Sequence, residues 1–101
     1  DTSKVITVKG TVTKVSWVNP HISFYVDVKG DGGKVTNWGF DGAAPSALNR
    51  RGWGRDSLKP GDVVTVESAT ARNGMPLGAA NMVTMPDGRR VAAGSDGAGP
   101  R

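Results

Sequence analysis

Cysteine is absent from this chain of 101 residues, and histidine occurs once, at His21. The lack of cysteine excludes disulfide bonds, thiolate metal sites and cysteine nucleophiles. No apolar run approaches the roughly 20 residues that a membrane-spanning helix requires, so the sequence predicts no membrane span. Aromatic residues make up only 6% of the chain, so any binding site must use a small set of distinctive side chains.

Glycine and proline are abundant for the length. Fifteen glycines and six prolines favour many turns and short strands over long helices. The length suits one domain, and 37% hydrophobic residues suffice for one modest core. We therefore assign residues 1–93 to a single domain and the polar, glycine-rich residues 94–101 to a flexible C-terminal tail.

Alternating or β-branched stretches predict five strands. In residues 5–17 the apolar face changes phase between Val12 and Val15, which indicates a bulge or sharp coil, and Gly10 would permit close backbone approach there. Residues 21–28 alternate most cleanly between an apolar and a polar face. The remaining strands are expected at residues 34–40, 63–69 and 77–85, the last forming a small hairpin with residues 89–92.

One helix is predicted, at residues 42–52, between the third and fourth strands. Pro45 suits a first turn, and Gly52 can adopt the left-handed conformation that ends a helix. Three strands, a short helix and two further strands follow the order of the OB fold. An SH3-like barrel is the main competitor, but the helix position favours an all-β, five-stranded OB-like barrel with one short helix between strands 3 and 4.

Several uncommon strings occur in order along the chain. They are KGTV at 9–12, WVNPH at 17–21, NWGF at 37–40, RRGWGRDSLKPGD at 50–62 and MPDGR at 85–89. In these strings the chain resembles a family of small exported proteobacterial proteins of unknown function, over about Val5 to Val91. The resemblance implies a signal peptide before Asp1 and a periplasmic or secreted location, and it implies no reaction.

The first residue, Asp1, suits two interpretations: a trimmed chain, or a mature exported protein whose signal peptide has been removed. More distantly, the architecture and residue types are similar to those of the periplasmic OB-fold copper chaperones of metal-efflux systems. That likeness depends on fold analogy, which does not by itself assign a function.

Aromatic and basic side chains provide the main candidate for a ligand-binding surface, here called the predicted rim. OB barrels use such surfaces to stack bases or sugars and to hold phosphates. The structural alternative is that Trp38 belongs to the core while Trp17 and Trp53 cap the barrel ends, since tryptophans supply large buried areas. The predicted rim comprises Trp17, Asn19, His21, Trp38, Arg51, Trp53 and Arg55.

His21 with methionine sulfurs is a second candidate, as a copper(I) or silver site using Met82 and Met85. These methionines are three positions apart, so in a regular strand they point to opposite faces. A bulge, or Met75 from its loop, would be needed to complete the site. The structural alternative for His21 is a hydrogen bond to backbone. A harder ion shared with Asp27 is excluded, because six positions of strand span about 20 Å.

The sequence thus predicts a non-catalytic binding or accessory module that holds a small ligand or a periplasmic protein partner at the predicted rim. A copper(I) or silver carrier and an OB-type oligonucleotide binder are the alternatives. No paired-carboxylate spacing or Ser-His-Asp arrangement supports an enzyme, and no cofactor other than copper is suggested. The net charge of +4 favours acidic partners only weakly, and an exported location argues against nucleic acid.

Overall fold

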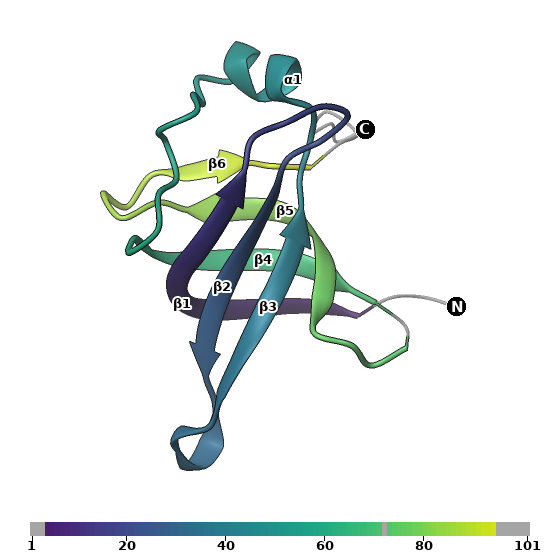
Figure 1. Cartoon of the computed structure of the whole chain (residues 1–101), viewed down its shortest axis with the longest axis vertical. Coiled ribbons are helices and arrows are strands. Elements are labelled where there is room, and N and C mark those ends of the chain that lie inside the picture. Colours follow the sequence, from purple (N-terminus) through teal and green to yellow (C-terminus); the bar gives the residue numbers. More distant parts are fainter. Residues whose placement is uncertain (1–3, 72, 95–101) are drawn as a thin grey trace.

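The computed structural model describes residues 4–71 and 73–94, and most of them form strands (Figure 1). The predicted strands are confirmed to within two residues at each end. The tail predicted at residues 94–101 lies, from residue 95 onward, outside the described residues. The elements are β1 (Val5–Ser16), β2 (Ser23–Lys29), the short 3-10 helix η1 (Asp31–Gly33), β3 (Val35–Asp41), α1 (Pro45–Arg50), β4 (Val63–Thr70), β5 (Leu77–Thr84) and β6 (Arg90–Ala92).

The strands close into a barrel. Antiparallel ladders join them in the order β3–β2–β1–β4–β5–β6, and a parallel pairing of β3 with β5 completes the ring. In that parallel pairing Gly39 lies opposite Leu77, and Asp41 lies opposite Ala79. The predicted OB-like barrel is therefore confirmed, with α1 between β3 and β4 and with β6 added as an extra strand on β5.

β1 bends so that its first half pairs with β4 and its second half with β2 (Figure 1). The predicted irregularity is confirmed, because the register with β2 shifts between Val12 and Lys14, where the apolar face changes phase. The β4 ladder ends and the β2 ladder begins at Thr11, just before this shift. Gly10 has the other expected role, because a Cβ there would collide with the backbone oxygen of Asp27 and lie 2.8 Å from Val26 Cγ1.

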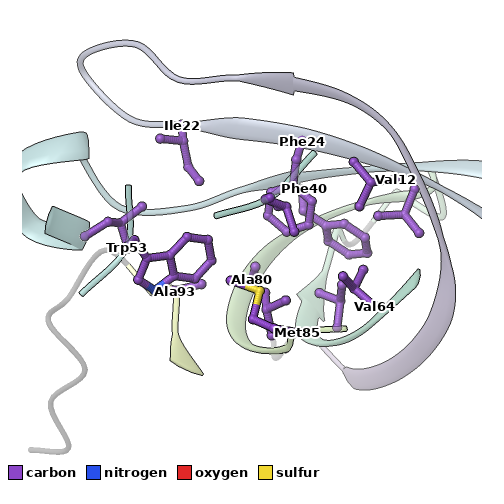
Figure 2. Packing of buried hydrophobic residues seen from close by; sticks show 14 of the residues in the cluster. Val12, Ile22, Phe24, Phe40, Trp53, Val64, Ala80, Met85 and Ala93 are labelled. Atoms are coloured by element: carbon purple, nitrogen blue, oxygen red, sulfur yellow. The ribbon is translucent and has the colours of Figure 1, made fainter. Parts of the chain in front are cut away.

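The core fills the barrel with side chains from β1 to β5 and from the segment after α1 (Figure 2). The rings of Phe24 and Phe40 lie at 5.4 Å between centroids. The alternation predicted for residues 21–28 is confirmed, since Ile22, Phe24 and Val26 are fully buried. The other large buried side chains are Val12, Leu48, Trp53, Leu58, Val64, Val66, Val83 and Met85.

α1 spans only Pro45–Arg50, so the prediction of a helix over residues 42–52 is wrong at its N-terminal side. Gly42 is extended there because its backbone N–H donates to the Ile22 oxygen at 3.0 Å, a bond that continues the β2–β3 ladder. The stop at Gly52 is as predicted, with a positive φ of 95°. Neither described helix is both long and apolar enough to cross a bilayer.

Candidate functional site

Trp17 and Trp53, two members of the predicted rim, come together at one end of the barrel. Their ring centroids are 6.5 Å apart and their planes differ by 29°. Trp53 is only 4% exposed, and its indole Nε1 donates to the Ala92 oxygen at 3.1 Å. Figure 2 shows it within the core cluster, near Ala93. Trp53 therefore closes this barrel end, and the half-buried Trp17 lies against it.

Arg51 is committed to the backbone at the same end. Its guanidinium donates to the Ala92 oxygen at 3.3 Å and to the Gly94 oxygen at 3.0 Å. Since Trp53 also donates to Ala92, the two side chains together hold the end of β6 on the barrel. Arg55, in the loop that follows, is exposed.

The rest of the predicted rim is divided between the surface and the interior. Asn19 and His21 are exposed in the connection between β1 and β2. His21 Nδ1 lies 3.3 Å from the Ile22 oxygen and 3.9 Å from the Asp41 carboxylate. Trp38 instead stacks on the buried ring of Phe40, with centroids 5.8 Å apart, so it is partly buried against the core rather than beside the Trp17–Trp53 pair.

The residues considered for copper have different surroundings. Met85 is buried in the core at 4% exposure, whereas His21 is exposed. Met82 is half-buried and lies on the side of β5 opposite to the buried Val83 and Met85. The bulge in the β4–β5 ladder comes before Met82, so it does not bring Met82 and Met85 onto one side. Within residues 4–71 and 73–94, no three His, Asp or Glu side chains are grouped so that they could hold a metal ion.

A groove of about 360 Å³ lies on the outer face of the barrel, where β3 meets β5. Tyr25 of β2, Gly39 of β3 and Leu77 of β5 are successive partners across three strands. A Cβ on Gly39 would lie 3.0 Å from Tyr25 Cε2 and 3.1 Å from Leu77 Cδ2. Gly39 is itself buried, so it forms a floor that the half-buried Tyr25 ring and Leu77, which is 45% exposed, cover from two sides.

Polar side chains continue this surface onto β1 and down the β2–β3 hairpin. Lys14 Nζ lies 5.9 Å from the centroid of the Tyr25 ring, a cation–π arrangement. Further along, Asn37 Nδ2 donates to Asp27 Oδ1 at 2.8 Å and to Thr13 Oγ1 at 3.2 Å. Tyr25 thus lies between the mostly apolar lining of the groove on one side and polar side chains of β1 and the β2–β3 hairpin on the other.

The groove is a site that the sequence analysis missed. The alternation of residues 21–28 places Tyr25 on the outward face of its strand, and an outward aromatic residue is a signal that could have found it. Gly39 and Leu77 carry no comparable signal, because only the parallel pairing of β3 with β5 brings them together.

The shifted pKa values lie away from the groove, around β6. Arg90 donates to both carboxylate oxygens of Glu67, at 2.8 and 3.0 Å, and these hydrogen bonds lower the pKa of Glu67. The same pair raises the pKa of Arg90. Hydrogen bonds from the backbone and side chain of Arg89 lower the pKa of Asp87. The Glu67–Arg90 pair ties β6 to β4, whereas the Asp87–Arg89 contacts stay within the turn before β6, and neither has a part in the groove.

Comparison with known proteins gives a family but no activity. Residues 1–80 match the model of a Family of unknown function (DUF6152). No curated protein and no solved structure matches the chain. The prediction that the chain belongs to a family without an assigned function is confirmed.

Proposed function

The chain belongs to the family of unknown function DUF6152, and we propose that it is a non-catalytic binding module whose ligand lies in the groove between Tyr25 and Leu77. The observation that carries this proposal is the row of an aromatic ring, a glycine floor and an exposed leucine across β2, β3 and β5. Ligand sites commonly combine apolar and aromatic walls with a few placed polar groups.

Tyr25 is suited to this role by its neighbours. On an antiparallel sheet, a side chain at a partner position packs on the ring; Lys14 does so from β1, but Gly39, the partner on β3, has no side chain. Tyrosine also loses little conformational entropy on binding, because only two χ angles become fixed. A ligand in the groove can therefore contact the ring and Leu77 without first displacing other side chains.

The predicted rim has fewer side chains to offer a ligand. Trp53 is buried and Arg51 is bonded to backbone oxygens, which leaves Asn19, His21 and Arg55 exposed around that barrel end. A partner could dock there through these polar groups. The groove is preferred because it pairs an aromatic with an aliphatic side chain around an opening.

A periplasmic location, implied by the family resemblance, is part of the proposal. Fractionation of cells that express the whole gene would test it: the protein is expected in the periplasmic fraction, and retention in the cytoplasm would contradict this part.

The binding proposal is tested by NMR titration of ¹⁵N-labelled protein with three probes: cellotriose, pentalysine and the oligonucleotide dT10. We expect at least one probe to shift the amide signals of residues 25, 39 and 77 saturably. Tyr25→Ala should weaken that binding about tenfold, since an aromatic contact is worth about 1.4 kcal/mol, and Tyr25→Phe should preserve it.

The double variant Asn19→Ala/Arg55→Ala, at two exposed residues of the predicted rim that line neither hollow, is the matched control, and it should leave binding to the Tyr25 groove unchanged. Saturable shifts confined to residues 17–21 and 51–55 would overturn the placement of the site in the groove. The absence of saturable shifts with all three probes would overturn the binding proposal itself.

A further inference from the structure

The groove does not end at Leu77. A second hollow, of about 410 Å³, follows it along the seam between β3 and β5 and is lined by His21, Asn81 and Gly94 among others. Asp41 and Ala79, which are partners in the parallel pairing, line both hollows. The groove and the second hollow are therefore neighbours along the seam, and the two together are called the channel below.

The two parts of the channel differ in chemistry. The first has the aromatic ring of Tyr25 and the side chain of Leu77, while the second has the imidazole of His21, the amide of Asn81 and the carboxylate of Asp41. Asp41 is 63% exposed, and Ser23 Oγ donates to its Oδ1 at 3.1 Å, which orients the carboxylate. The channel thus passes from an apolar contact surface to a group of hydrogen-bonding side chains.

The charge of the channel disfavours an anionic ligand. Among the described residues that line it, Asp41 is the one carboxylate, and no lysine or arginine lines either hollow; Lys14 lies beside the Tyr25 ring but outside both linings. A phosphate in the second hollow would therefore approach the Asp41 carboxylate without a lysine or arginine on the wall to compensate it. This argues against a nucleotide or an oligonucleotide.

The backbone of the seam disfavours an added peptide strand. β3 and β5 are paired with each other at residues 39–41 and 77–79, so their backbone groups are already used along the channel. Peptides that bind by strand addition need an unpaired sheet edge. The ligand must instead be recognised by side chains.

We propose that the channel binds a neutral oligosaccharide. A pyranose ring has an apolar C–H face, which can pack on the Tyr25 ring, and hydroxyls around its edge. The next sugar of the chain would lie in the second hollow, where its hydroxyls would form hydrogen bonds with Asp41, His21 and Asn81. The strand from Leu77 to Asn81 spans about 13 Å, which is longer than one sugar ring. This assignment rests on the proposed function and adds the class of ligand and its direction along the seam.

The test is an NMR titration with maltotriose, cellotriose and chitotriose, each compared with the methyl glycoside of its single sugar. At least one trisaccharide should bind about tenfold more tightly than its methyl glycoside, because it adds hydrogen bonds in the second hollow. Asn81→Ala should remove this gain and leave the binding of the methyl glycoside unchanged. Asn19→Ala, at an exposed asparagine outside the channel, is the matched control and should change neither.

Tyr25→Ala should weaken the binding of both the trisaccharide and the methyl glycoside, and Tyr25→Phe should leave the binding of both unchanged. Thermal unfolding of each variant confirms that it is folded. If the Asn81→Ala variant still binds the trisaccharide about tenfold more tightly than the methyl glycoside, the proposed role of the second hollow is wrong. If pentalysine or dT10 shifts residues 25, 39 and 77 while no trisaccharide does, the oligosaccharide assignment is wrong and the binding module stands. If no probe binds saturably, both proposals fail.

Discussion

The barrel end closed by Trp53 and the outer face that carries Tyr25 use aromatic side chains in opposite ways. Trp53 is 4% exposed, and its indole N–H and the neighbouring Arg51 are both bonded to backbone oxygens. Tyr25 lies over Gly39, so no side chain covers it from the partner position on β3, and from β1 it is approached only by the long, polar Lys14 side chain. The first aromatic group stabilises the fold, and the second is accessible to a ligand.

The difference shows what leaves an aromatic side chain accessible in so small a barrel. Burying an indole contributes a large hydrophobic free energy, so tryptophans near the core are drawn into it even when arginines flank them in sequence. A tyrosine remains accessible where its cross-strand partner is too small to cover it. Four substitutions test this contrast.

Replacing Trp53 should cause the largest loss of stability. Trp53→Ala removes a buried indole and its hydrogen bond, and we expect the free energy of unfolding to fall by about 3–5 kcal/mol in urea denaturation. Trp53→Phe, which retains most of the apolar area, should cost clearly less. A loss below about 1 kcal/mol for Trp53→Ala would show that the side chain is not an essential part of the core.

Replacing Arg51 should cause the second-largest loss of stability. Arg51→Ala deletes two hydrogen bonds to the backbone oxygens of Ala92 and Gly94, and we expect a loss of about 1–2 kcal/mol in the same urea experiment. The exposed neighbour Arg50 provides the matched control, and Arg50→Ala should change stability by less than about 0.5 kcal/mol. Equal losses for the two variants would contradict the structural role of Arg51.

Tyr25→Ala should affect stability less still, although it is expected to weaken ligand binding. The ring makes only cross-strand contacts on the outer face, so the free energy of unfolding should fall by less than about 1 kcal/mol. Urea denaturation of the unliganded protein measures this change. A loss as large as that of Trp53→Ala would place Tyr25 among the packing residues and remove the contrast between the two regions.

The smallest effect is expected at Glu67, far from both aromatic sites. Arg90 lowers the pKa of Glu67 below its usual 4.5 in the folded protein, so the pair stabilises the fold above that pH. The contribution is lost as the pH falls through the folded-state pKa. Glu67→Gln should therefore lower Tm slightly at neutral pH and not at strongly acidic pH. A difference that persists in acid would contradict the ion pair as its cause.

Much of the barrel could be predicted because its signals are local. The alternation of residues 21–28 gives the buried face of β2, and the phase change after Val12 gives the bend of β1. The extent of the helix could not be predicted in the same way. Gly42 is drawn into an extended conformation by a hydrogen bond to Ile22, a partner that only the assembled barrel supplies.

The candidate site was harder to predict because its parts are distant in sequence. Tyr25 and Leu77 are 52 positions apart in the chain, and they meet across Gly39 only through the parallel pairing. The tryptophans and arginines gave a stronger sequence signal, yet Trp53 and Arg51 are used in packing and backbone bonding. Residue type alone does not distinguish a covered ring from an uncovered one.

The parallel seam between β3 and β5 also couples ligand binding to the opening of the barrel. A ligand that touches Tyr25 on one side and Leu77 on the other can bind only while the seam is closed. At a ligand concentration a hundred times Kd, mass action would raise the free energy of opening by about 2.7 kcal/mol. The Gly39 amide, which donates across the seam to the Pro76 oxygen at 3.0 Å, would then exchange its hydrogen with solvent more slowly. Hydrogen exchange at this amide would report occupancy even for a ligand with no spectroscopic signal of its own.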